Sequence, residues 1–441
     1  SLQQLLLLVQ DYSCLSGEHF ELASGVLSPT GAALAPEQAL EKQEATSLEQ
    51  THRLADTMMQ FTIDLLREMQ RDNSKDNVIL SPFSIALALS QLALGAANQT
   101  EKHLLEALHV EALPCLHQML SSVRKELTKT VLDMAARIYL QKGFEVKEKF
   151  LEDSERFYGA KPETLSGDGE DDLLAINNWV KEATNGQIPS FLTELPQSVV
   201  MILLNAVHFQ GFWRHKFSPS LTAPDMFRLN DEFMVSVEMM KAQKYPLSWF
   251  TLDDLDVQVA KFPFKGNMSF VAIVPNQFEW NITQVLVSLN QAELRSRFPR
   301  EKPTLVKMPK LHLDYQVELN QALRRLGLGE LFSRPDLQHI SEGPLFVSSI
   351  QHQSALRLAE DGVEASAATG VLMSRSISTF SLNQPFVFII YEETTGIPIF
   401  LGNIQNPNPS APQQRIEQQD SPDDKNVVQG SEEIFYLTPT C

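Results

Sequence analysis

The chain has 441 residues, 43% of them hydrophobic, and a formal net charge of −19 at pH 7. This length and composition are typical of a soluble globular protein with a large core. The acidic balance argues against nucleic acid or an anionic membrane as the main partner, and no apolar run approaches the roughly 20 residues that span a bilayer.

The first fifty residues are rich in Ala, Glu, Gln and Ser and show no sustained period, so we expect a flexible tail over 1–50. The apolar run from Leu5 to Val9 leaves two interpretations open for residues 1–15, a remnant of a secretion signal or an apolar tail. Order is predicted to begin near Thr51, because Leu54 and Met58 start an apolar stripe at helical spacing.

The middle of the chain alternates irregularly between helix and strand patterns. The run over 199–209 is apolar on both faces, which predicts a central strand. Other patterns predict helices at 82–89, 102–110, 171–185, 282–289 and 315–326, and strands at 77–80, 137–140, 257–260, 268–274, 305–308, 386–391 and 398–401. Helices first, mixed strands later and no βαβ repeat indicate an α+β fold.

A long insert over about 360–380 separates two strand patterns. Connections of this length inside a compact domain are usually functional or disordered. Arg375 followed by Ser376 is a sequence that a trypsin-like protease accepts, because an Asp at the base of its specificity pocket pairs with the guanidinium. A short helix over the Ala-rich part, with an incidental Arg-Ser pair, is the alternative interpretation.

The first half of this insert is suited to entering a sheet. No charged residue lies between Glu364 and Arg375, so its desolvation would cost little. Ladder hydrogen bonds are each worth about 0.5–1.5 kcal/mol. A dozen of them would rival the roughly 5–15 kcal/mol by which a typical fold is stable.

The remaining motifs favour a secreted glycoprotein without a metal site or cofactor. The cysteines, Cys14, Cys115 and Cys441, are far apart and form no CxxC pair, and a disulfide between Cys14 and Cys115 is one pairing that they allow. Glycosylation sequons begin at Asn98, Asn267 and Asn281, and with so few cysteines they favour secretion. After Asn406 the chain turns polar and acidic, which predicts a disordered tail over 408–441.

Common catalytic motifs are missing from the sequence. It has no GxSxG elbow, no HExxH pair and no GxxxxGK loop. Ser, His and Asp side chains that lie far apart in sequence can still form a triad in space. We nevertheless predict that the protein is not an enzyme.

Three segments resemble the signatures of the serpins. The segment over 203–217, which contains Asn205 and Trp213, resembles the central-sheet signature of that family, and 383–407 resembles its C-terminal signature. With Ser81-Pro82-Phe83-Ser84 and Gly362, the resemblance covers 51–407. It implies a serpin fold, with mixed β-sheets, about nine helices and an exposed reactive-centre loop over about 360–380.

The resemblance also implies a mechanism and a set of partners. The protein is expected to be a monomeric suicide-substrate inhibitor of plasmin and other trypsin-like serine proteases, secreted into plasma, where it regulates fibrinolysis. The target serine would attack the Arg375 carbonyl, and the loop would insert into the main sheet before the acyl-enzyme is hydrolysed. The alternatives are a non-inhibitory carrier or structural serpin, or an inhibitor of a different Arg-specific protease.

Site residues carried over from the family fall into two groups. The first group gates the sheet. It contains a hydrogen-bonded cluster, Ser81, Ser84, Asn205 and His352, and three residues at the opening of the sheet, Trp213, Lys310 and Glu360. Lys310 and Glu360 are expected to form an ion pair. Hinge residues are Gly362, Val363, Glu364, Ala365, Ser366, Ala367 and Ala368.

The chain also departs from the family pattern. Val363 stands where many inhibitory serpins carry Thr or Ser, Gln384 replaces a basic residue, and the spacing from Gly362 to Arg375 is one residue short. Fibrin association through the tails is disfavoured. Lys425 is the one lysine after residue 407, which disfavours docking to kringle domains, and Gln3 and Gln4 stand in an unlike context for crosslinking.

Overall fold

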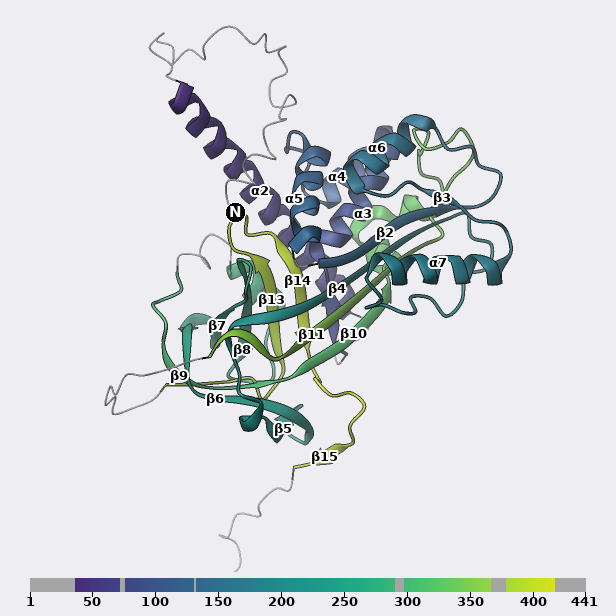
Figure 1. The fold of residues 1–441 in the computed structure, drawn as a ribbon. Helices are drawn as coiled ribbons and strands as arrows, with labels where there is room; N and C mark the ends of the chain where they lie inside the picture. Colours follow the sequence, from purple (N-terminus) through teal and green to yellow (C-terminus); the bar gives the residue numbers. More distant parts are fainter. Residues whose placement is uncertain (1–35, 72–75, 131, 290–296, 366–377, 417–441) are drawn as a thin grey trace, which may run out of the picture.

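The computed structural model describes residues 36–71, 76–130, 132–289, 297–365 and 378–416, and its folded body is built on two sheets (Figure 1). The smaller one, called the main sheet here, has five strands in the order β10, β11, β4, β2, β3. Their bounds are β2 Leu132–Leu140, β3 Glu163–Thr164, β4 Met201–Lys216, β10 Leu311–Glu318 and β11 Ser349–Ala365.

The second sheet has ten strands, eight of them along one path from β1 to β12, while β5 and β15 pair with β6. The strands are β1 Val78–Leu80, β5 Ala223–Arg228, β6 Phe233–Leu252, β7 Val257–Pro263, β8 Met268–Pro275, β9 Lys302–Pro309, β12 Ser378–Ser381, β13 Phe386–Glu392, β14 Pro398–Ile404 and β15 Gln413–Arg415. β13 and β14 are fully buried, as expected for strands covered on both faces.

Eight α-helices lie in the described part of the chain, against about nine expected. In Figure 1, α2 to α6 gather at one end of the molecule, and α7 runs beside β2. The bounds are α2 Pro36–Gln70, α3 Pro82–Gly95, α4 Asn98–Ala107, α5 Leu116–Thr130, α6 Glu148–Tyr158, α7 Gly169–Ala183, α8 Ile282–Ser288 and α10 Asn320–Leu323. Helices and mixed sheets together confirm the predicted α+β class.

The predicted central strand is confirmed as β4, and each of its two faces packs into a different hydrophobic cluster. Ile202 and Leu204 pack with Ile176 of α7 in one core cluster, whereas Leu203 belongs to the larger cluster on the other side. Successive side chains of a strand point to opposite faces, so both faces of β4 require apolar residues.

The structure corrects three expectations. The helix predicted near Thr51 begins at Pro36, because 36–50 is rich in strong helix formers even without an apolar stripe. The helix predicted over 315–326 is wrong at its start, where β10 continues to Glu318 in period-two alternation, and α10 covers only Asn320–Leu323. The expected disordered tail contains β15, which pairs with β6 from Gln413 to Arg415.

Candidate functional site

The candidate site is the seam between β4 and β11, which run parallel and pair directly. The register extends from Ser349 opposite Ile202 to Leu358 opposite Gly211, and resumes from Gly362 opposite Trp213 after a shift. β11 ends at Ala365, within the loop predicted over about 360–380. Polar side chains cross the seam in two clusters. One lies near the middle of the seam, and the other lies near its upper end, which is the end where β11 finishes at Ala365.

His352 is the centre of the middle cluster. Its Nδ1 lies 2.6 Å from Asn205 Oδ1 on the facing strand, and its Nε2 lies 2.8 Å from Ser354 Oγ. The backbone N–H of Ser81 donates to the same Nε2 at 3.2 Å. Because a backbone amide can only donate, Nε2 must be an acceptor, and the Nδ1–H therefore donates to Asn205.

Burial keeps this imidazole neutral. His352 is 0% exposed, and desolvation lowers its pKa to about 3. A charged imidazole would lose its solvation in this site without gaining a carboxylate. The cluster is thus a set of neutral hydrogen bonds at ordinary pH.

Helix α3 joins this cluster through its N-terminus. Ser81 is the N-cap, and its hydroxyl accepts from the Ser84 N–H at 3.4 Å. Asn205 Nδ2 donates to the Ser84 carbonyl at 2.8 Å. The four residues that the family resemblance predicts as one cluster, Ser81, Ser84, Asn205 and His352, therefore link the N-terminus of α3 with β4 and β11.

Trp213 and Glu360 are the main residues of the upper cluster. Trp213 is fully buried, its ring stacks on Phe264 at 4.6 Å, and its Nε1–H donates to the Ala359 carbonyl of β11 at 2.7 Å. Lys310 Nζ lies 3.0 Å from Glu360 Oε2. The ion pair expected between Lys310 and Glu360 is therefore present in the structure.

Glu360 has two further partners that bind it to the chain following β4. Thr222 Oγ1 donates to Glu360 Oε1 at 2.8 Å, and the Phe217 N–H donates to the Glu360 carbonyl at 3.0 Å. Burial alone would raise the pKa of Glu360, but hydrogen bonds from Thr222, from its own backbone N–H and from Lys310, together with the charge of Lys310, outweigh burial and hold that pKa below its usual value. The carboxylate is ionised and held at the seam's upper end.

Gly362 allows the two strands to approach closely above the register shift. A Cβ there would lie 2.7 Å from Lys216 Cα and 2.7 Å from the Trp213 carbonyl oxygen. Both are backbone atoms, so no side-chain rotation would relieve the contact. A residue with a side chain at 362 would force β4 and β11 apart.

The loop itself is described only at its ends. The hinge residues Val363, Glu364 and Ala365 belong to the last part of β11. After the loop, β12 pairs in parallel with β9, starting at Ser378 opposite Thr304. The other predicted loop residues, Ser366, Ala367, Ala368, Arg375 and Ser376, lie outside the described residues.

Two residues of the clusters were not predicted from the sequence. Ser354 lies two positions after His352, and a period of two on β11 would have placed both on one face. Thr222 follows a short 3-10 turn at Pro219–Leu221, and no periodic signal connects it to Glu360, which is 138 residues away. Only folding brings these two together.

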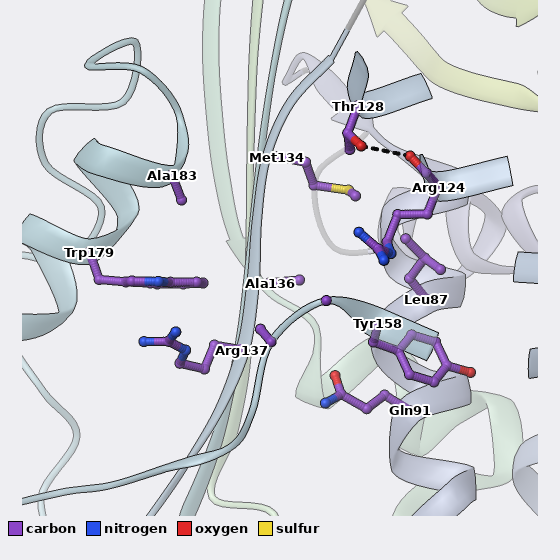
Figure 2. Close-up of a pocket in the computed structure, with 12 residues that line it drawn as sticks. Leu87, Gln91, Arg124, Thr128, Met134, Ala136, Arg137, Tyr158, Trp179 and Ala183 are labelled. Atoms are coloured by element: carbon purple, nitrogen blue, oxygen red, sulfur yellow. Dashed lines mark hydrogen bonds between the residues drawn. The ribbon is translucent and has the colours of Figure 1, made fainter. Parts of the chain in front are cut away.

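A cavity of about 190 Å³ lies away from the seam, at the edge of β2 (Figure 2). Its lining contains no member of the two polar clusters. In the described part of the chain, no group of three or more His, Cys, Asp or Glu side chains is placed to hold a metal ion. None of the described helices is long and apolar enough to cross a membrane.

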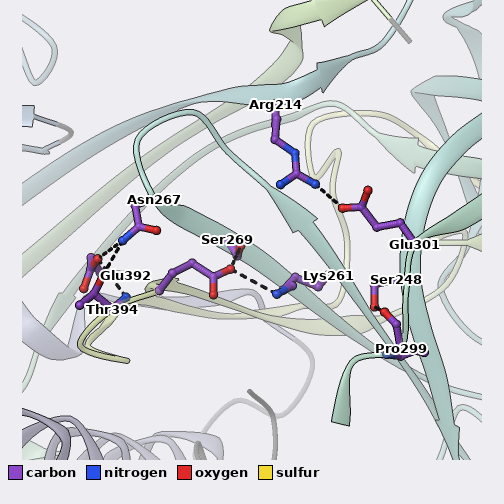
Figure 3. Close-up of polar contacts among 10 residues, drawn as sticks. Arg214, Ser248, Lys261, Asn267, Ser269, Pro299, Glu301, Glu392 and Thr394 are labelled. Atoms are coloured by element: carbon purple, nitrogen blue, oxygen red, sulfur yellow. Dashed lines mark hydrogen bonds and ion pairs between the residues drawn. The ribbon is translucent and has the colours of Figure 1, made fainter. Parts of the chain in front are cut away.

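The three sequon asparagines differ in their surroundings. Asn98 Nδ2 donates to Asp336 at 2.8 Å, and Asn281 caps α8 through its Oδ1. Asn267 Nδ2 donates to both Glu392 Oε1 and Thr394 Oγ1 at 2.7 Å (Figure 3). A glycan on Asn267 would therefore replace one of these hydrogen bonds. Glycosylation at all three positions stays a prediction.

The cysteine expectation also stays a prediction. Cys115 is half-buried and has no disulfide partner among the residues that the structure describes. Cys14 and Cys441 lie outside them.

Comparisons with known proteins agree with this geometry. A family model described as serpin (serine protease inhibitor) matches residues 56–407. Alpha-2-antiplasmin of Bos taurus is 52% identical over 401 residues, which cover 90% of this chain and 82% of the relative. Alpha-2-antiplasmin of Mus musculus is 53% identical over 389 residues, which cover 88% of this chain and 79% of the relative.

A solved structure extends the match to the fold. Mouse protein-Z dependent protease inhibitor aligns with a TM-score of 0.74 at 26% identity, covering 82% of this chain and 99% of that one. The predicted serpin fold is confirmed. Because the family model spans most of the chain and two relatives share about half of its residues, this protein belongs to the serpin family.

Proposed function

We propose that this protein is a secreted suicide-substrate inhibitor of plasmin and other trypsin-like serine proteases, with Arg375-Ser376 as the reactive bond. The names of the two antiplasmins, each about half identical to this chain, support plasmin as the target. An arginine followed by a serine in the loop supports a trypsin-like specificity. The inhibitory unit is taken as 51–407, with tails at 1–50 and 408–441.

The observation that carries the proposal is the direct pairing of β11 with β4, which extends to the hinge residue Ala365 opposite Lys216. The seam is closed by the backbone ladder between β4 and β11 and by the two polar clusters, and an entering strand would replace that single ladder with one on each of its sides.

The proposed reaction begins as ordinary proteolysis. The protease serine oxygen attacks the Arg375 carbonyl carbon, the peptide bond to Ser376 breaks, and the new amino group of Ser376 takes the proton. An ester now joins the protease to Arg375. The freed segment from Gly362 to Arg375 inserts between β4 and β11 and carries the protease with it.

Inhibition then depends on insertion being faster than hydrolysis of the ester. Displacing the acyl group from the oxyanion hole slows deacylation, since losing one oxyanion donor alone costs about 10²–10³ in rate. The covalent complex persists. Fibrin association is not part of this proposal, because the tail after residue 407 has a single lysine, Lys425.

Incubation with equimolar plasmin tests the proposal. We expect an SDS-resistant adduct, loss of plasmin activity and release of a C-terminal peptide that begins at Ser376. Plasmin with its catalytic serine replaced is the control and should give neither product. A cleaved chain with fully active plasmin would contradict inhibition and favour a non-inhibitory serpin, for which Val363 in the hinge is the motivating residue.

A further inference from the structure

The cavity at β2 is bounded on one side by a strand edge that, within the described residues, has a neighbouring strand only at its end. β2 pairs with β4 from Leu132 to Leu140, but β3 pairs with it only at Tyr139 and Leu140. Helices α3 and α5 and the end of α6 close the cavity on one side, and α7 on the other. Figure 2 shows Arg124, Gln91 and Tyr158 on one side of β2, with Trp179 and Arg137 on the other.

Arg124 brings an uncompensated positive charge to this cavity. Its Nε donates to the Phe157 carbonyl at 3.4 Å, and no acidic residue of the described chain is ion-paired with its guanidinium. Burial lowers the pKa of Arg124, with no carboxylate acting against that effect. Partly buried guanidinium groups are usually paired with an anion, so a partner is missing.

Two further hydrogen-bond donors at the cavity lack partners within the described chain. Gln91 is 3% exposed, and its Nε2 makes no hydrogen bond. Arg137 Nε is likewise buried without a partner, although its guanidinium lies 4.0 Å above the Trp179 ring. Buried polar groups are nearly always satisfied. Here the unsatisfied atoms are N–H donors, so an occupant that accepts hydrogen bonds fits them.

Gly159 leaves room for the guanidinium of Arg124. It ends α6 in the left-handed conformation, with a φ of 76°, and a Cβ there would lie 2.6 Å from Arg124 Nη1. A glycine thus lets the guanidinium lie against the backbone at the cavity wall. Leu87, Met134 and Ala183 supply apolar lining, so the cavity combines a guanidinium group on each side of β2 with apolar walls.

We propose that this cavity binds a small aromatic carboxylate, with its carboxylate on Arg124 and Gln91 and its ring against the apolar walls. The volume of about 190 Å³ exceeds the roughly 150 Å³ of an apolar cavity that holds benzene, which suits one substituted ring. A carboxylate matches the fork of a guanidinium. The net charge of −19 does not attract anions in general, so binding must come from the local donors.

Calorimetric titration of the intact protein with 4-ethylbenzoate tests the inference. We expect saturable one-to-one binding, at least tenfold tighter than that of the neutral isostere 4-ethylbenzamide, together with a rise in the midpoint of thermal unfolding. Equal affinities would overturn it, since an apolar void alone would explain them. Equally tight binding of inorganic sulfate would also overturn it, because the apolar walls would then contribute nothing. So would no binding at millimolar ligand.

Substitutions locate the site. Arg124→Gln should weaken 4-ethylbenzoate binding at least tenfold, whereas the neighbouring exposed Lys125→Gln should not. Gln91→Leu, which keeps the volume and removes the donor, gives a second measurement if Arg124→Gln fails to fold. Binding that is unchanged in both Arg124→Gln and Gln91→Leu would place the ligand elsewhere and overturn the inference. The inference does not depend on the proposed function.

Discussion

His352 of β11 and Asn205 of β4 face each other across the seam, and the 2.6 Å hydrogen bond between His352 Nδ1 and Asn205 Oδ1 closes it. Neighbouring strands lie about 4.8 Å apart, so a strand inserted between these two would roughly double their separation. The bond cannot survive insertion. The hydrogen bond between His352 and Asn205 therefore stabilises the intact protein and must break when a strand is inserted.

Replacing His352 with alanine should destabilise the intact protein more than the cleaved one. The change leaves Asn205 Oδ1 and the Ser81 N–H without the partners that His352 provides, at about 1–3 kcal/mol for each buried unsatisfied group, and adds a cavity. Urea unfolding of both forms measures the difference. Equal losses in the two forms would show that the pair is ordinary core and has no part in holding the seam.

Acid should destabilise the protein partly through His352. The pKa is about 3 in the folded protein and about 6.5 in an unfolded chain, so between these values the unfolded state binds a proton that the folded state does not. Stability then falls as the pH falls from about 6.5 to 3, by at most about 1.4 kcal/mol per pH unit from this group.

The test is the free energy of unfolding of His352→Gln as a function of pH. Between about pH 6.5 and pH 3 it should change less steeply than that of the natural protein. His117 is the matched control, because burial lowers its pKa to about 4. In His117→Gln, the free energy of unfolding should depend less steeply on pH only between about pH 6.5 and pH 4. A His352→Gln curve parallel to that of the natural protein would contradict the assignment.

Glu360→Ala should make the seam easier to open without a large loss of stability. The partly exposed ion pair with Lys310 is worth about 1 kcal/mol or less, but Glu360 also accepts from Thr222 across the seam. We expect faster uptake of a synthetic peptide with the sequence of 362–375, followed by a change in mobility on a native gel. Glu342→Ala, which removes an ion pair with Lys147, should leave the uptake rate unchanged.

Gly362→Ala should separate the upper ends of β4 and β11. Its Cβ would meet two backbone atoms at 2.7 Å, and overpacking of this kind costs about 1–3 kcal/mol. Hydrogen exchange should become faster at the Phe217 amide, which donates to the Glu360 carbonyl. Gly169→Ala is the control, because a Cβ there would meet nothing within 4 Å. Unchanged exchange at Phe217 would show that the strands tolerate the added methyl group.

Arg375→Glu should abolish inhibition of plasmin and trypsin while the fold is kept. The acidic base of a trypsin-like pocket would repel a carboxylate at this position, and we expect at least a hundredfold lower rate of inhibition, measured with a chromogenic substrate. Arg334→Glu, at an exposed position, is the charge-matched control and should inhibit normally. Inhibition that persists in Arg375→Glu would move the reactive bond to another position.

Elements with a strong local pattern were predictable from the residues. β4 is apolar on both faces and was identified as a central strand, and the strand over 386–391 matches β13. The helix predicted over 315–326 is wrong at its start because Tyr315 and Val317, which stand at strand spacing on β10, also fit helical spacing with the apolar residues that follow. Short apolar patterns of this kind fit both periods.

The sequence by itself determined the fold class, the central strand and, through its signature segments, the family. These properties depend on residues that are near neighbours in the chain. Only the tertiary structure decided that His352 meets Asn205, 147 residues away, that Thr222 reaches Glu360, and that Arg124 and Gln91 share one cavity. Such contacts arise when separate elements pack on one another, and no local pattern records which elements will become neighbours.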